Sequence, residues 1–212
     1  MQNYLDQFQQ YWAQFSQTLR LNTAQSESLF LLLNVAYSQN YYHTHQHIVE
    51  CLDLFHQIKT QLDDPVAVEL AIWFHDVIYD PQASENEQQS ADFMQKHGVG
   101  ILAKAELEKV ARWIIATKEH LPTTEHDLQY VLDIDLAILG ASAPRFTEYE
   151  QQIQQEYAWV NPVIYQQKRM EVLETFAQME PLYQTDYFRQ NYEVQAKINL
   201  NNALKSIKTQ VV

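Results

Sequence analysis

The sequence predicts an all-α protein, and three observations favour helices over strands. Only three of the 212 residues are glycine and six are proline, so few positions interrupt regular structure. Gln and Glu dominate the polar residues, and both favour helix. No segment alternates hydrophobic and polar residues in the manner of a strand. Because the length fits one domain with a sizeable core, we expect a single-domain helical bundle over residues 1–212.

The expected helices follow one another with short connections. The first is amphipathic, because its aromatic and aliphatic residues recur at helical spacing. Asp64 before Pro65 has the form of a cap followed by proline at the first helical position. Ser84 stands three residues before Glu87, which is the spacing of a capping box. The expected ranges are about 4–19, 24–38, 45–62, 64–80, 84–98, 101–118, 126–139, 145–158, 162–178 and 185–208.

Charge and composition limit the partners. A formal net charge of −13 makes long nucleic acids and anionic membranes poor partners, because both need a basic surface. A small phosphorylated ligand stays compatible, since a bound metal reverses the field locally. Cys51 is the only cysteine, so we expect neither an intrachain disulfide nor a thiolate metal cage. The first residues do not resemble a signal peptide, and the longest apolar stretch, residues 29–33, is too short to span a bilayer. We expect a cytoplasmic protein.

The segment AIWFHDVIYD places His75 and Asp76 inside an almost unbroken apolar run. Burying an ionised Asp is unfavourable unless a cation or several donors meet it. Neighbouring residues lie about 100° apart on a helix, so side chains of unequal length can converge between them. Imidazole and carboxylate together suit a divalent first-row metal. A buried His–Asp hydrogen bond is the alternative.

Two other segments carry the same kinds of side chain. In YHTHQH, His43 and His47 are four residues apart and could share a helix face, whereas His45 and His47 cannot. One packed and two solvated histidines are the alternative there. Downstream, Asp133 and Asp135 interrupt a strongly apolar helix. Because they are two residues apart, we expect only one of them to reach a common site.

A His, then an adjacent His-Asp pair, then a distant Asp, all on helices, resembles the HD superfamily of metal-dependent phosphohydrolases. Longer segments resemble one uncharacterised branch of that superfamily, over about residues 40–200. These segments are Tyr42-His43-x-x-Gln46-His47-Ile48, residues 71–81, Asn86-Glu87-x-x-Ser90-Ala91, Thr117-x-x-His120 and Asp133-x-Asp135-Leu136-x-Ile138-Leu139-Gly140. The resemblance implies an HD-type bundle with a metal-site core at about residues 40–140 and C-terminal helices at about 145–208.

The resemblance also implies one divalent metal ion (Mn, Co, Ni, Fe, Mg or Zn) as cofactor, held by His47, His75, Asp76 and Asp135. Asp135 is preferred to Asp133 because HD proteins usually place the last ligand directly before a Leu-type turn. HD proteins with two metals typically carry an adjacent histidine pair, and this chain has none. The expected function is hydrolysis of a small phosphomonoester or nucleotide by a metal-activated water.

Asp76, His120 and Glu87 are the expected catalytic residues. His120 could give a proton to the leaving group, or be a solvated histidine at a helix end. Glu87 could orient a water or hold a ligating histidine, or serve only as part of the capping box.

His43, Lys118 and Arg169 are the expected substrate-binding residues. Lys118 could bind phosphate or be an ordinary surface lysine. Arg169 could clamp a phosphate bidentately. Its ordinary alternative is an interhelix salt bridge with Glu171, Glu174 or Glu193.

Other functions stay open at this point. A regulator that binds metal or nucleotide without catalysis would use the same scaffold, and a di-iron oxygenase would need more histidines. A purely structural adaptor would leave Asp76 and Asp135 without charge partners unless an Arg or Lys lies near them. The aromatic N-terminal helix could close a homodimer or pack on the core.

Overall fold

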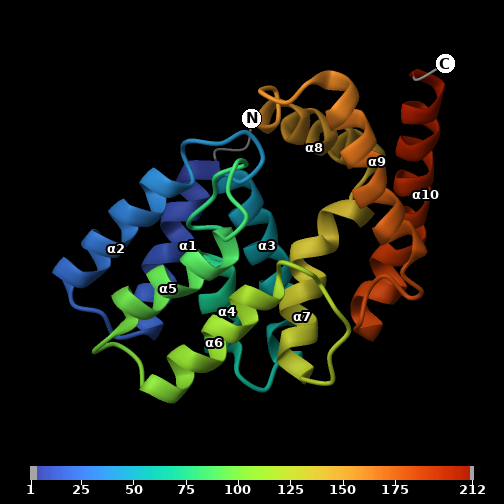
Figure 1. Ribbon diagram of the computed structural model, residues 1–212. Helices are drawn as coiled ribbons and strands as arrows, with labels where there is room; N and C mark the ends of the chain where they lie inside the picture. The colour runs from blue at the N-terminus through green and yellow to red at the C-terminus, as the bar shows by residue number, and fades with distance from the viewer. Residues whose placement is uncertain (1–3, 211–212) are drawn as a thin grey trace. The chain divides into compact units, whose positions relative to one another are not determined.

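The computed structural model describes residues 4–210 and confirms the all-α prediction. Within these residues the chain forms ten α-helices and two short 3-10 helices, and no strand (Figure 1). The chain divides into two compact units, Met1–Ile134 and Asp135–Val212. The single domain therefore stays a prediction. Over the described range, no helix combines the length and the apolar character needed to cross a membrane.

The helices lie close to the expected ranges. The first unit contains α1 (Tyr4–Thr18), α2 (Thr23–Ala36), α3 (His45–Ile58), the 3-10 helix η1 (Lys59–Gln61), α4 (Pro65–Phe74), α5 (Asn86–Gly98), α6 (Lys104–Ala116) and all but the last residue of α7 (His126–Asp135). The second unit contains the 3-10 helix η2 (Leu136–Gly140), α8 (Ala143–Glu156), α9 (Pro162–Gln178) and α10 (Asp186–Gln210).

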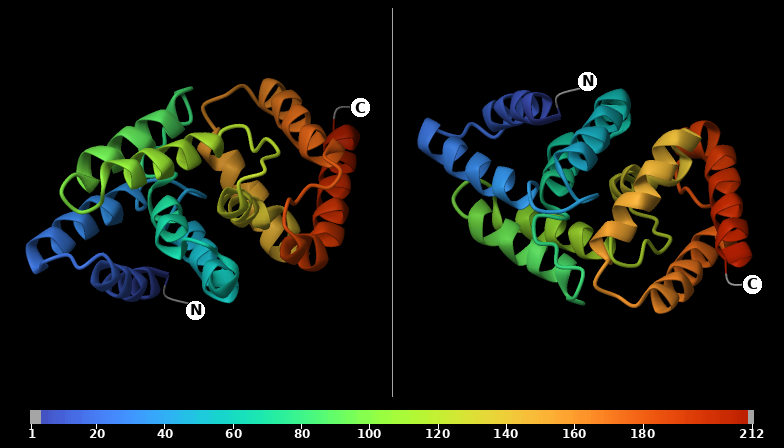
Figure 2. Two further views of the ribbon diagram at one scale, coloured as in Figure 1. Left: turned by 90° about the horizontal axis from the view of Figure 1, so that it is seen from below. Right: turned by 90° about the horizontal axis from the view of Figure 1, so that it is seen from above.

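Helix α4 forms the centre of the first unit. Every residue from Ala67 to Phe74 is buried, as expected for a helix that is apolar on all sides. Its start confirms the predicted cap, because the Asp64 carboxylate accepts a hydrogen bond from the Ala67 N–H at 3.1 Å and Pro65 follows directly. Helix α4 packs on α3 and α6, and α5 lies along α6 (Figure 2).

The aromatic face of α1 packs on this centre. The rings of Phe8 and Trp12 lie 4.8 and 5.3 Å from Trp73 of α4, between ring centroids, and both pairs are edge-to-face. Phe15 stacks on the same indole at 6.4 Å. All four side chains are buried. The buried face of α1 therefore serves the core, and a homodimer stays a prediction.

The predicted helix over 64–80 is wrong at its C-terminal end, because α4 stops at Phe74. The chain turns away there, and backbone groups of Ile78 and Asp80 bond to the side chains of Ser90 and Asn86 instead of continuing the helix. His75 and Asp76 thus lie in the turn that follows α4, not within a helix.

The predicted capping box at the start of α5 is also wrong. Glu85 is the N-cap residue, without a side-chain hydrogen bond to the helix. The Ser84 hydroxyl donates to the Glu85 carboxylate at 3.4 Å instead of reaching the helix backbone.

In the second unit, η2 is anchored on α10. The Asn199 amide donates hydrogen bonds of 2.8 Å to the carbonyls of Leu139 and Ala141. Gly140 lies so close to α10 that an added Cβ would come within 2.7 Å of the Tyr192 carbonyl oxygen. Helix α9 also packs on α10, and α8 packs on η2.

Candidate metal centre

The first turn of α3 carries His47 into the interior of the first unit. The residue is 2% exposed. One helical turn later, the Cys51 thiol lies 3.7 Å from His47 Nδ1. The thiol lies 3.9 Å from Nε2 of the same ring, and Nε2 also faces His75 and Asp76 in the turn after α4.

The turn after α4 presents His75 and Asp76 together. The His75 N–H still bonds to the Ala71 carbonyl at 2.9 Å, so His75 is fixed to the last turn of the helix. Its side-chain Nδ1 lies 2.9 Å from the Ile72 carbonyl oxygen. A carbonyl can only accept, so Nδ1 carries the proton and Nε2 of the neutral ring keeps its lone pair. This second hydrogen bond is of the kind that orients histidines in metal sites.

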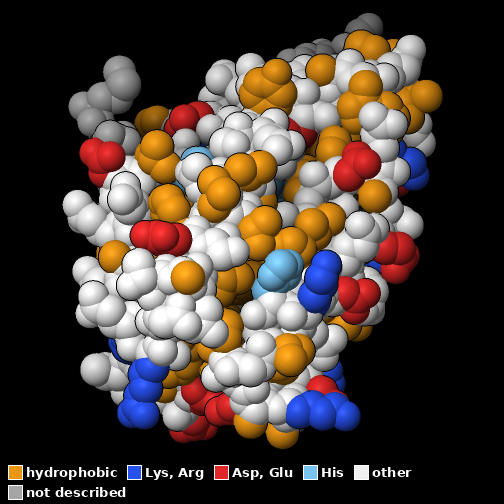
Figure 3. All heavy atoms as spheres, turned by 90° about the vertical axis from the view of Figure 1, so that its left-hand side faces the viewer, with side chains coloured by type: hydrophobic (Ala, Val, Ile, Leu, Met, Phe, Trp, Pro, Cys, Tyr) orange, Lys and Arg blue, Asp and Glu red, His pale blue; other side chains and the backbone are white. Residues whose placement is uncertain are grey.

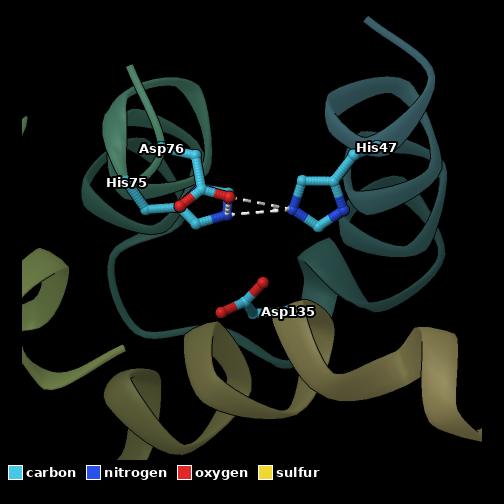
Figure 4. Close-up of side chains that lie close together, drawn as sticks. All are labelled: His47, His75, Asp76 and Asp135. Carbon is cyan, nitrogen blue, oxygen red and sulfur yellow. Dashed lines mark hydrogen bonds and ion pairs between the residues drawn. The ribbon is translucent and has the colours of Figure 1, made fainter. Parts of the chain in front are cut away.

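Three acceptor atoms converge at this point (Figure 4). His47 Nε2 lies 3.1 Å from His75 Nε2 and 3.4 Å from Asp76 Oδ2. His75 Nε2 lies 3.1 Å from the same Asp76 oxygen. One proton on His47 could serve only part of this group, because His75 Nε2 has none to give. The arrangement fits a bound cation.

Asp135 supplies the fourth side chain of the cluster. It is the last residue of α7, and the rest of that helix belongs to the first unit, so the helix carries Asp135 to the cluster. His47, His75, Asp76 and Asp135 each offer one ligand atom, and these atoms all lie within 4.8 Å of one another. The predicted set is brought together, and among the described residues Asp133 is not part of it. Two nitrogen and two carboxylate donors suit a divalent first-row metal.

Asp76 is held in its ionised form. Burial by itself would raise the pKa of this carboxyl, but the neighbouring imidazoles of His75, His43 and His47 lower it well below its usual range. Every ion pair that the described residues give Asp76 is with an imidazole. The salt bridge to Arg or Lys that a structural adaptor would need is not seen at Asp76.

His43 lies at the edge of the cluster. It precedes α3, and its Nε2 is 3.9 Å from Asp76 Oδ2. Its ring stacks on Tyr79 with centroids 3.6 Å apart and an angle of 21° between the planes. His45 points elsewhere, because its Nε2 lies 3.0 Å from the Asn34 side-chain oxygen and its ring packs edge-on against Phe8. Burial lowers the pKa of His45.

The other predicted site residues lie outside the cluster. Glu87 is half-buried in the first turn of α5. His120 follows α6 with a positive φ of 49°, and its N–H bonds to the Ala116 carbonyl at 3.1 Å, as in a left-handed helix cap. Lys118 donates to the Ser84 carbonyl at 2.5 Å and lies 3.6 Å from the Glu85 carboxylate. Lys118 therefore holds the loop that precedes α5.

Arg169 belongs to the second unit and pairs with a residue that was not expected. Its guanidinium donates to Glu150 and lies 5.1 Å above the Tyr149 ring. The expected partners are engaged elsewhere: Glu171 with Lys168, Glu174 with Lys208, and Glu193 with the backbone of Leu182 and Tyr183. Glu150 and Arg169 line a cavity of about 450 Å³ within this unit.

Sequence reasoning assigned no role to a second His-Asp dipeptide, His126-Asp127, although it is plain in the sequence. With Asp63 it forms another group whose ligand atoms lie within 4.8 Å of one another. The Asp127 oxygens already accept hydrogen bonds from the backbone N–H groups of Asp63 at 2.9 Å and Asp64 at 2.6 Å. These bonds give Asp127 a structural role at the start of α4.

No protein-family model matches this chain, and no curated protein matches it.

Proposed function

We propose that this protein is a metal-dependent phosphohydrolase of the HD type that acts on a small phosphomonoester or nucleotide. The observation that carries the proposal is the convergence of His47 Nε2, His75 Nε2 and Asp76 Oδ2 within 3.4 Å of one another. Asp135 completes a group of four. The order of these residues along the chain resembles the HD superfamily, and the fold that holds them is all-α, as that resemblance requires.

The four side chains would hold one divalent ion. Such an ion, when bound, lowers the pKa of a coordinated water and polarises a phosphoryl group. The protein contributes a carboxylate that stays ionised at Asp76 and an imidazole at His75 whose orientation is fixed by Ile72. The buried surroundings of His47 and His75, which are 2% and 3% exposed, exclude competing water.

His43 is proposed to contact the substrate. Its side chain is 14% exposed and lies beside Asp76 without belonging to the cluster. An imidazole there can donate a hydrogen bond to a phosphoryl oxygen. His120 is proposed to protonate the leaving group, and Glu87 to orient a water. Lys118 donates one hydrogen bond to Ser84, and its ammonium group has further N–H donors with which to contact a phosphate.

A small substrate agrees with the charge of the chain. The net charge of −13 disfavours a long polyanion. On the face shown in Figure 3, the Lys and Arg side chains of the described residues are few and scattered and form no continuous basic patch. Recognition of one phosphate by a metal ion and His43 needs no such patch.

Metal analysis of the purified protein, followed by a phosphatase screen, tests the proposal. We expect one divalent ion per chain and release of phosphate with Mn, Co, Ni or Mg salts. Asp76→Ala should lose both. Asp92→Ala is the matched control, because Asp92 lies exposed on α5 and bonds only to Gln88 among the described residues.

Two outcomes would count against the proposal. Tight metal binding and a ligand-induced thermal shift, with no turnover across a broad panel of phosphorylated metabolites, would favour the regulator. Two irons per chain would favour the oxygenase.

A further inference from the structure

Two polar side chains of α5 hold the chain that follows Asp76. The Ser90 hydroxyl accepts from the Ile78 N–H at 3.0 Å and donates to the Ile78 carbonyl at 3.2 Å. The Asn86 side chain does the same for Asp80, accepting from its N–H at 3.1 Å and donating to its carbonyl at 2.9 Å. Each side chain therefore satisfies both backbone polar groups of one residue, as a neighbouring strand would. We call this arrangement the α5 clamp.

The spacing of the α5 clamp matches its target. Four residues of α-helix rise about 6 Å, and two residues of extended chain span about 6.6 Å. Residues four apart on α5 can therefore face residues two apart on the adjoining segment. Ser90 is fully buried and Asn86 is 9% exposed, so water competes little for these hydrogen bonds. The side chains of the clamp carry no net charge.

The clamped segment leads back to the candidate metal centre. Tyr79 lies between the two clamped residues, and its ring stacks on His43 with a centroid distance of 3.6 Å. His43 in turn lies 3.9 Å from the Asp76 carboxylate. Asp76 itself is only two residues before Ile78. The clamp thus acts on the site by two routes, through the backbone to Asp76 and through Tyr79 to His43.

Holding the loop in place would not by itself require the four buried hydrogen bonds of the α5 clamp. The same loop is also held by the exposed side chain of Lys118, which donates a single hydrogen bond to the Ser84 carbonyl. The α5 clamp differs because it is buried, uses four hydrogen bonds, and grips the residues on either side of Tyr79. Its position implies a task at the site and not only in the loop.

We propose that Ser90 and Asn86 are positioning residues that fix Asp76 and His43 in the arrangement that receives the metal ion and the phosphoryl group. They touch neither group themselves. This inference rests on the proposed function, and it adds a role for α5 that the metal-binding residues do not require.

Cobalt(II) binding by the full-length chain tests the inference. Ser90→Ala and Asn86→Ala should weaken cobalt binding about tenfold, as loss of groups that orient ligands typically does. They should also change the visible absorption spectrum of bound cobalt. Gln88→Ala is the matched control, because Gln88 lies on the exposed face of the same helix and bonds only to Asp92 among the described residues.

A second readout needs no metal. The ring current of Tyr79 shifts the NMR signals of the His43 imidazole while the two rings are stacked. Asn86→Ala and Tyr79→Ala should move these signals toward ordinary values, whereas Tyr79→Phe, which keeps an aromatic ring, should leave them displaced. If Ser90→Ala does not fold, Asn86→Ala still tests the inference, and Tyr79→Ala gives the position of the His43 signals without the ring current.

The outcomes separate the two hypotheses. If the unaltered protein takes up no cobalt, the proposed function fails and this inference fails with it. If the unaltered protein binds cobalt and both clamp variants bind it with the same affinity and spectrum, the inference alone is overturned. Faster amide exchange at Ile78 and Asp80 in those variants would then show that the clamp serves only the loop.

Discussion

The chain contains two His-Asp dipeptides, His75-Asp76 and His126-Asp127, and the structure uses them in different ways. The first lies in a buried turn, and a nitrogen of His75 and an oxygen of Asp76 both face His47. In the second, the imidazole is 47% exposed and the carboxylate is occupied by two backbone N–H groups. The dipeptide alone therefore indicates nothing about metal binding. What distinguishes the candidate metal site is that nitrogen atoms of two buried imidazoles converge with a carboxylate oxygen on one point.

Removing one histidine from each group should give the largest difference. His47→Ala removes a ligand, and we expect metal affinity to fall by at least about 100-fold, since even groups that only orient ligands contribute about 10–100-fold. His126→Ala should leave affinity unchanged. Isothermal titration with cobalt or manganese measures both. An equal loss of metal affinity in the two variants would contradict the assignment of the metal site to His75-Asp76 and not to His126-Asp127.

Removing the second carboxylate should affect stability instead of metal binding. Asp127→Ala leaves the N–H groups of Asp63 and Asp64 without their acceptor at the start of α4. We expect the free energy of unfolding to fall by about 2–3 kcal/mol. Denaturant unfolding measures this, and metal titration of the same variant should match the unaltered protein. A loss of metal binding without a loss of stability would reverse the assigned roles.

Glu69 provides a contrast with Asp76, because its carboxyl is also buried but has no imidazoles around it among the described residues. Burial raises its pKa to about 7, and Lys59, with Nζ 3.9 Å away, offsets this only in part. The folded protein therefore keeps a proton between the ordinary pKa of 4.5 and about 7 that the unfolded chain releases, so stability falls as the pH rises through this window.

Glu69→Gln should remove this pH dependence. We expect the variant to be more stable than the unaltered protein by about 2 kcal/mol at pH 8 and nearly equal to it at pH 5. Urea unfolding at the two pH values provides the measurement. A variant that is less stable at pH 8 would show that the ionised carboxylate is better compensated than its surroundings indicate.

The smallest effect is expected at Lys118, which touches neither dipeptide. Its contacts with Ser84 and Glu85 are largely exposed, so Lys118→Ala should lower the free energy of unfolding by less than about 1 kcal/mol. The same variant tests the proposed phosphate contact. A several-fold rise in KM with unchanged kcat would support this contact. Unchanged kinetics would show that Lys118 only holds the loop before α5.

Hydrophobic spacing predicted the helices well, because each apolar face is set by nearby residues. The end of α4 could not be found in this way. Residues 71–74 and 77–78 are all apolar, so no local feature stops the helix at Phe74. After this stop, the backbone N–H groups of Ile78 and Asp80 donate hydrogen bonds to Ser90 and Asn86, which lie on the next helix. A prediction from local sequence patterns does not include hydrogen-bond partners that lie on another helix.

The candidate site was predicted only in part, because some of its contacts also join residues that are distant in the sequence. Helical geometry indicated that only one of Asp133 and Asp135 could join a cluster, and the resemblance selected the one that the structure places there. The pairing of Arg169 with Glu150 was missed, because the expected partners were chosen among other glutamates. The stacking of Tyr79 on His43 left no signal in the sequence, since it depends on how the turn folds back.

The position of His75 at the C-terminal end of α4 has a consequence for the field at the site. The peptide dipoles of a helix add up to a partial negative charge at that end, where the last carbonyl groups point. One of these carbonyls, that of Ile72, already orients His75. Because α4 is buried from Ala67 to Phe74, water screens this dipole little, and the helix itself attracts a cation toward the ligands at its end.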